Sequence, residues 1–314
     1  MTTDFTNRTV IITGAGGGLG RTYALEIARR GGMVVVNDLG GNVTGNSASH
    51  SMADGVVDEI RAAGGKAIAN YDSVSTAEGA QAIAEAAMSE FGRIDALINN
   101  AGNLRNAPFD EVTQDDRDSI MGVHLMGTWN VTQAVWPHMK RAGYGRIVFT
   151  ASGVGAFGNA TQSAYGAAKG GTIGLMNTLA LEGRDHGILC NTLLPNAASR
   201  MSEAMLPESM KVMGQNTARF RTAMRPEFIC PVTVYLASEA CQTTHEMYSV
   251  LGGRVARAFI GVTEGWLGPR DVPPSVEDVA SHMGQIRDES RGFTIPGSLP
   301  DEFRLLDEQI ANRS

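Results

Sequence analysis

The sequence predicts a doubly wound α/β fold, in which helices cover both faces of a parallel seven-stranded sheet. Short apolar, β-branched runs alternate with longer helical patterns along most of the chain. The runs are almost continuously apolar, as a sheet buried on both faces requires, and such alternation is typical of parallel sheets with right-handed crossovers. The seven expected strands are Thr9–Thr13, Met33–Asn37, Lys66–Asn70, Ile94–Asn99, Arg146–Thr150, Leu189–Leu194 and Val255–Gly261.

Five helical stretches are expected between these strands, and two more after them. The five are Arg21–Arg30, Asp54–Ala63, Ala77–Phe91, Gln114–Arg141 and Ala164–Arg184. We expect one domain over residues 1–267 and a C-terminal extension over residues 268–314, which is Pro-rich and charged. The extension could hold helices near Val276–Ile286 and Asp301–Ile310. Two interpretations of it stay open: a solvated tail, or an arm packed on a partner subunit or over the active site.

Composition excludes several classes of protein. The 314 residues are 43% hydrophobic and 19% charged, as in ordinary globular proteins. A net charge of −7 argues against a nucleic-acid partner. No apolar run approaches the ~18 residues of a membrane span. The three cysteines have no metal-ligand spacing, so we expect free thiols, no metal site and a reducing, cytoplasmic location, and the last residues lack a peroxisomal Ser-Lys-Leu signal.

A glycine-rich turn follows the first expected strand and precedes a helical pattern. It starts at Thr13 and includes Gly14, Gly18, Leu19 and Gly20. Glycines let the backbone turn tightly and approach a pyrophosphate, and the helix N-terminus after them offers free N–H groups to it. Because the turn lies between a strand and a helix, it indicates a dinucleotide site of the Rossmann type rather than a mere tight turn.

Acidic residues after the next strands indicate which dinucleotide is bound. Asp38 ends the second strand, where a carboxylate bonds the ribose hydroxyls of NAD and repels the 2′-phosphate of NADP. No Arg or Lys occurs at residues 15–18 or at Leu39. We therefore expect NAD as the cofactor, with Asp72 near its adenine. Further cofactor contacts are expected where the fourth strand ends, at Asn99, Ala101 and Gly102.

Three polar side chains form a candidate catalytic set. Tyr165 and Lys169 are four residues apart near a helix start, so they share one face, and Ser152 follows the fifth strand. A tyrosine with a free-solution pKa near ~10 is a poor base at neutral pH. A neighbouring cation favours the phenolate, and a serine hydroxyl can hold the substrate oxygen while hydride leaves the carbon. Together the three predict an alcohol dehydrogenase.

The chain resembles the short-chain dehydrogenase/reductase family over residues 5 to about 267, through the glycine turn, the Asn-Asn-Ala-Gly run that ends at Gly102, and Ser152 with Tyr165 and Lys169. This resemblance implies that Tyr165 is the acid/base, that Lys169 tunes it and binds ribose, and that Ser152 orients the substrate. The family usually has a proton-relaying Asn where this chain has His124. Either His124 relays protons or it is an ordinary core histidine.

A closer resemblance is to the dehydrogenase domain of peroxisomal multifunctional enzymes type 2, which also carries His at the position of His124. It is carried by Val34–Gly41, Ala69–Val74, Val123–Leu125 and Pro195–Met201. This branch implies oxidation of (3R)-hydroxyacyl-CoA thioesters and, in some members, of 17β-hydroxysteroids. Pro195 is expected on the cofactor. The alternatives are a dehydrogenase of free steroids and, remotely, a nucleotide-sensing protein without turnover.

The resemblance places a substrate-covering segment at residues 200–225. It holds five methionines, including Met201 and Met205, which suit a lid over an apolar ligand, although an ordinary amphipathic helix is equally compatible. Arg219 and Arg221 could receive the phosphates of coenzyme A or form a solvated face. The family also implies a homodimer or homotetramer formed through the long helical stretches.

Overall fold

The computed structural model describes residues 3–40, 50–197 and 219–311. The chain divides into two compact units, Met1–Arg257 and Ala258–Ser314. Met201 and Met205, and most of the expected substrate-covering segment, lie outside the described residues. Among the described helices, none combines the length and the apolar character needed to cross a membrane.

The first unit is built on an eight-stranded sheet in the order β3-β2-β1-β4-β5-β6-β7-β8. Every pair from β3 to β7 is parallel, and β1 pairs with β2 along its full length, from Thr9 opposite Met33 to Thr13 opposite Asn37. This confirms the predicted doubly wound sheet. The strands are β1 Thr9–Thr13, β2 Met33–Asn37, β3 Lys66–Asn70, β4 Ala96–Asn99, β5 Gly145–Thr150, β6 Ile188–Asn196, β7 Glu246–Leu251 and β8 Arg254–Ala258.

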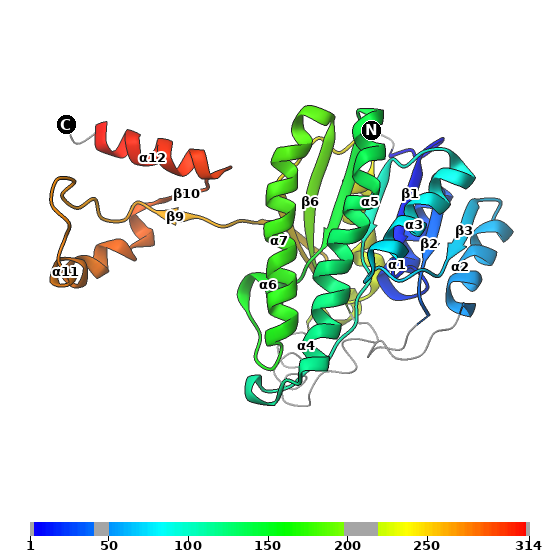
Figure 1. Cartoon of the computed structure of the whole chain (residues 1–314), viewed down its shortest axis with the longest axis horizontal. Coiled ribbons are helices and arrows are strands. Elements are labelled where there is room, and N and C mark those ends of the chain that lie inside the picture. Colours follow the sequence, from blue (N-terminus) through cyan, green and yellow to red (C-terminus); the bar gives the residue numbers. More distant parts are fainter. Residues whose placement is uncertain (1–2, 41–49, 198–218, 312–314) are drawn as a thin grey trace. The chain divides into compact units, whose positions relative to one another are not determined.

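Helices form a layer on each face of the sheet. In one layer α1 packs against both α2 and α10, and in the other α5 packs against both α3 and α7 (Figure 1). The helices of the first unit are α1 Gly18–Arg29, α2 Ser51–Ala62, α3 Ala77–Phe91, α4 Gln114–Met121, α5 Gly127–Ala142, α6 Gly153–Phe157, α7 Ser163–Gly183 and α10 Cys230–Ala237. Both layers bury apolar side chains against β1, β4 and β5, whose residues are buried throughout.

Two sequence predictions need correction. The last parallel strand was expected at Val255–Gly261, but the parallel neighbour of β6 is β7, Glu246–Leu251, and the expected segment mostly forms the added edge strand β8. β7 lacks the continuous apolar run of a central strand, because only two of its six residues are buried. The single helix expected over Gln114–Arg141 is interrupted, because a π-helical segment, η2 Gly122–Met126, separates α4 from α5.

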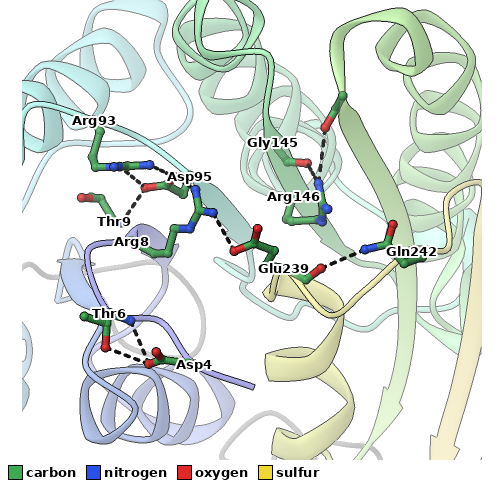
Figure 2. Close-up of polar contacts among 11 residues, drawn as sticks. Asp4, Thr6, Arg8, Thr9, Arg93, Asp95, Gly145, Arg146, Glu239 and Gln242 are labelled. Carbon is green, nitrogen blue, oxygen red and sulfur yellow. Dashed lines mark hydrogen bonds and ion pairs between the residues drawn. The ribbon is translucent and has the colours of Figure 1, made fainter. Parts of the chain in front are cut away.

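A network of charged side chains ties together the ends of the strands opposite the carboxyl edge (Figure 2). The Asp95 carboxylate, just before β4, accepts hydrogen bonds from the guanidinium groups of Arg93 (2.6 Å) and Arg8 (2.8 Å) and from the Thr9 backbone N–H (2.8 Å). Arg8 also pairs with Glu239 at 2.7 Å. Burial opposes ionisation of Asp95, but the bonds from Arg93, Thr9 and Arg8 outweigh it and hold its pKa below the ordinary value.

The second unit contains two helices and a two-stranded antiparallel ribbon. The ribbon pairs β9 Val262–Thr263 with β10 Phe293–Thr294, and the helices are α11 Val276–Ile286 and α12 Leu299–Ala311, as predicted. A capping box between Ser275 and Asp278 begins α11. Neither helix contains a buried residue, so the apolar side chains of both helices stay at least partly exposed.

Candidate active site

A cavity of about 460 Å³ lies at the carboxyl ends of the central strands in the first unit. Parallel α/β sheets bind their ligands at this edge. The cavity collects residues that are far apart in the sequence. Those predicted as site residues that line it are Leu19, Gly102, His124, Ser152, Tyr165, Lys169 and Pro195.

The fold positions Ser152, Tyr165 and Lys169 from two neighbouring elements. Ser152 follows β5 as the N-cap of α6, where its Oγ accepts a hydrogen bond from the Val154 N–H at 3.1 Å. Tyr165 and Lys169 lie one turn apart in α7, and the Lys169 Nζ is 5.7 Å from the centroid of the Tyr165 ring. The ammonium of Lys169 donates to the Thr150 carbonyl oxygen. The three polar groups therefore converge on the same cavity.

Burial sets the proton affinities of this set. Burial raises the pKa of Tyr165 above its ordinary value, and its hydrogen bond with Ser152 acts in the opposite direction. Burial lowers the pKa of Lys169 to about 7, because a charged ammonium is poorly solvated there. Burial thus moves the two pKa values in opposite directions, and such perturbed titratable groups in one cavity are typical of a site where a proton is exchanged.

His124 lies on the π-helical segment and is 1% exposed. Its Nε2 is 2.7 Å from the Asn103 carbonyl oxygen and 3.2 Å from the Asn103 backbone nitrogen, so it meets both an acceptor and a donor, and Nδ1 has no described partner. The ring stands edge-on to Tyr165, with centroids 5.0 Å apart. Burial and the charge of Lys169 hold the pKa of His124 well below its ordinary value, so the imidazole is neutral.

The glycine-rich turn has the shape needed for a dinucleotide phosphate. A Cβ at Gly20 would lie 2.3 Å from the Gly14 carbonyl oxygen, so only glycine allows this close packing of turn and helix. At Gly18, with φ +52°, a Cβ would have no atom within 4 Å, so the backbone faces open space. The N-cap of α1, Gly17, has no side-chain cap, and no acidic residue occupies the first turn. The N–H groups of this helix end therefore suit a pyrophosphate.

The other predicted cofactor residues do not line the cavity, and two of them, Asp38 and Ala101, contact the turn. The Asp38 carboxylate follows β2 and accepts hydrogen bonds from the Gly16 N–H (2.8 Å) and the Gly40 N–H (2.7 Å). Asp72 accepts a bond from the Asn70 amide at 2.7 Å. The remaining two lie at the end of β4 and just after it. Asn99 is buried and its amide donates to Thr132 of α5 at 2.9 Å, and Ala101 packs against Gly14, where an added Cβ would meet the Ala101 Cα at 2.8 Å.

The predicted substrate residues are not gathered at the cavity. Arg219 and Arg221 are exposed and are absent from the described lining of the cavity. Sequence reasoning also missed several lining residues, namely Leu104, Phe157, Asn159, Gln162, Asn196, Ser249, Leu251 and Arg254. Most of these lie on loops or on the misplaced β7–β8 hairpin, so no local motif identified them. In the described parts of the chain, no group of His, Cys, Asp or Glu side chains is arranged to hold a metal ion.

The chain is similar to known short chain dehydrogenases. The short chain dehydrogenase family pattern matches residues 8–207. A short-chain type dehydrogenase/reductase of Mycobacterium tuberculosis is 45% identical over 291 residues, which are 93% of this chain and 97% of that protein. Peroxisomal multifunctional enzyme type 2 of Mus musculus is 45% identical over 285 residues, 90% of this chain, but this chain spans only 37% of the length of the mouse enzyme.

Two solved structures are similar in fold. The full-length peroxisomal multifunctional enzyme type 2 from Drosophila melanogaster superposes with a TM-score of 0.79 at 33% identity, covering 98% of this chain and 50% of that chain. A 7α-hydroxysteroid dehydrogenase complexed with NADH and 7-oxo glycochenodeoxycholic acid has a TM-score of 0.70 at 27% identity, covering 80% of this chain and 95% of that chain. The 98% coverage means that similarity extends into residues 268–314, beyond the region that the motifs identified.

Proposed function

Because this chain belongs to the short chain dehydrogenase family, and is thus an oxidoreductase acting on CH–OH groups, we propose that it oxidises a secondary alcohol on a (3R)-hydroxyacyl-CoA thioester with NAD. The observation that carries the proposal is the convergence of Ser152, Tyr165 and Lys169 on one cavity beside the glycine-rich turn. A nucleotide-sensing protein without turnover would have no need of this convergence. The product of the proposed reaction is the 3-oxoacyl-CoA.

The three side chains divide the proton chemistry between them. Ser152 holds the substrate hydroxyl and, through its bond to the Tyr165 phenol, lowers the pKa of that phenol. Tyr165, as phenolate, takes the hydroxyl proton while the C–H bond breaks. Lys169, when protonated, favours the phenolate from 5.7 Å away. NAD, when bound, supplies the hydride acceptor. The neutral His124 stands edge-on to Tyr165 with an Nδ1 that has no described partner, which suits it to pass on the proton through water.

NAD is proposed over NADP because of Asp38. Its carboxylate already accepts bonds from two backbone N–H groups, so it is fixed beside the turn that would hold the pyrophosphate. A fixed negative charge there can bond ribose hydroxyls and repels a 2′-phosphate. Gly14, Gly18 and Gly20 would form the pyrophosphate cradle. The further proposed cofactor contacts are Leu19, Asp72, Asn99, Ala101, Gly102, Tyr165, Lys169 and Pro195.

The CoA thioester is proposed on similarity and on charge. The mouse relative is named a peroxisomal multifunctional enzyme type 2, and we extend the chemistry implied by that branch to this chain. The exposed side chains of Arg219 and Arg221 would receive phosphates of coenzyme A, with Met201 and Met205 covering the acyl group. The second candidate, oxidation of a free steroid alcohol, is favoured by the similarity to the 7α-hydroxysteroid dehydrogenase.

A homodimer or homotetramer is proposed on the outer faces of α5 and α7. A groove of about 790 Å³ between these helices is lined largely by apolar side chains, among them Trp129, Trp136 and Leu175. Trp129 is 46% exposed, whereas Met176 on the inner face of α7 is buried. Covering such an apolar surface with its copy across a two-fold axis removes it from water. The three free cysteines suit a reducing compartment, and we propose the cytoplasm, although named relatives are peroxisomal.

A substrate panel tests the proposal. The purified protein is mixed with NAD and either (3R)- or (3S)-hydroxyacyl-CoA esters or hydroxysteroids, and the absorbance of NADH is followed. We expect the (3R)-hydroxyacyl-CoA esters to have the highest kcat/KM. Free steroids that outperform every CoA ester would establish the second candidate, and an absence of NADH with all secondary alcohols would refute both.

A further inference from the structure

We propose that Arg254 is a specificity-determining residue that binds an anionic oxygen group of the substrate. This inference rests on the proposed function and adds a recognition element to it. Arg254 is the first residue of β8 and lines the same cavity as Tyr165. The anion could be a phosphate of coenzyme A or a carboxylate on the acyl group, because a guanidinium binds both with the same forked geometry.

The hairpin that carries Arg254 holds it at the carboxyl edge of the sheet. β7 ends with Leu251 opposite Asn196 of β6, one residue beyond Pro195. Gly252 and Gly253 then turn the chain with φ values of +58° and +85°. Two consecutive residues with positive φ form the tight turn that suits a two-residue hairpin, and glycine adopts it without strain. The turn therefore returns the chain directly to the cavity, and Arg254 is placed there by backbone geometry rather than by a mobile loop.

The charge of the cavity favours an anion. Its described lining contains no Asp or Glu and two cations, Lys169 and Arg254. Lys169 is 4% exposed and its ammonium donates to the Thr150 carbonyl, so it serves the catalytic end. Arg254 is exposed and can reach a charged group that stays partly solvated. In a chain of net charge −7, a cavity whose charged side chains are all positive is a local exception that favours negative ligands.

The hydrogen bonds of Arg254 leave it available for a ligand. Its Nη2 donates to the Ser249 Oγ at 3.2 Å, and within the described residues it pairs with no carboxylate. The next arginine of the strand differs, because Arg257 pairs with Glu246 at 3.4 Å and does not line the cavity. Since Ser249 orients the guanidinium while its other donors have no described partner, Arg254 is suited to a forked bond with two oxygens.

The cavity also has an apolar wall, which indicates what the uncharged part of the substrate is. Leu104, Phe157 and Leu251 contribute apolar surface to the cavity. An apolar body would contact these side chains while its anionic group bonds Arg254. A neutral alcohol of the same shape would bind through the apolar wall alone, and the two should therefore differ mainly in KM.

The test compares four proteins: wild type, Arg254→Gln, Arg254→Lys and the matched control Arg257→Gln. Each is assayed with NAD and two pairs of (3R)-hydroxyacyl thioesters. The first pair has one acyl chain on coenzyme A or on N-acetylcysteamine, which lacks the phosphates. The second pair consists of N-acetylcysteamine thioesters whose acyl chain ends in a carboxylate or in its methyl ester. In parallel, coenzyme A and octanedioate are titrated into each protein by calorimetry.

We expect Arg254→Gln to raise KM about 10- to 100-fold for the anionic member of one pair, the loss typical of a hydrogen bond to a charged group, with kcat unchanged. The pair affected identifies the anion as phosphate or carboxylate. Arg254→Lys should recover part of the loss, and Arg257→Gln should behave as wild type. An equal rise in KM for both members of each pair, or no rise at all, would overturn the inference.

A wrong proposed function would give a different set of results from a wrong role for Arg254. If wild-type protein oxidises none of the thioesters, the proposed substrate class is wrong. The calorimetric titrations then decide the role of Arg254 alone. Weaker binding of coenzyme A or octanedioate to Arg254→Gln than to Arg257→Gln supports the inference, and equal binding contradicts it.

Discussion

Gly102 lies so close to the His124 ring that a larger residue there should disturb the active site. A Cβ added at Gly102 would lie 2.6 Å from the His124 Cε1, whereas real Cβ contacts are almost never below 3.0 Å. The imidazole cannot retreat easily, because it is 1% exposed and its Nε2 is bonded to the Asn103 carbonyl. Gly102→Ala therefore overpacks this site, which typically costs about 1–3 kcal/mol. It also displaces the ring that stands edge-on to Tyr165, so turnover should fall.

The assay is thermal unfolding together with the rate of NADH formation. A protein of 314 residues loses roughly 1–2 °C in Tm per kcal/mol. Gly55→Ala is the matched control: it lies within α2 with open space around its Cβ, and should stabilise by about 0.5–1 kcal/mol. The double variant Gly102→Ala/His124→Asn should lose less stability than the two single variants added together. Additive losses, or an unchanged Tm for Gly102→Ala, would show that this contact does not constrain the site.

Three further outcomes are expected. Asp38→Ala should erode the preference for NAD, and a wild-type kcat/KM that is higher with NADP would contradict the cofactor proposal. Ser152→Ala removes the hydrogen bond that lowers the pKa of Tyr165, so that pKa should rise. The rate of alcohol oxidation increases as the phenol loses its proton, and this increase should therefore shift to higher pH. An unshifted pH profile would show that Ser152 does not set the pKa of Tyr165. Trp129→Glu should dissociate the oligomer in light scattering, and a wild-type monomer would refute the assembly.

The first strand, the glycine-rich turn and the pairing of Tyr165 with Lys169 follow from local sequence. β1, the glycine turn and α1 could be predicted because each step has its own signal: an apolar run, positions that need glycine, and a helical pattern. Tyr165 and Lys169 were paired by their spacing on one helix. In each case the residues that matter are neighbours in the chain.

The rest depends on contacts between distant segments. β7 was missed because a strand near the sheet edge buries only Met247 and Val250 and carries Glu246 and Ser249 between them. Periodicity cannot identify such a strand as parallel. Arg254 reaches the cavity only because that strand pairs with β6 and turns back at two glycines. The π-helical segment under His124 likewise leaves no pattern that distinguishes it from an α-helix.

In the proposed reaction, Tyr165 exchanges the proton of a secondary alcohol while NAD receives hydride. The most direct measurement is the rate of NADH formation by Tyr165→Phe with a (3R)-hydroxyacyl-CoA ester, alongside the affinity of the same variant for NADH. General acid–base groups contribute about 10²–10⁴-fold, so turnover should fall by that factor while NADH binding is retained. A loss of less than about tenfold, with binding intact, would contradict the account and remove Tyr165 from the role.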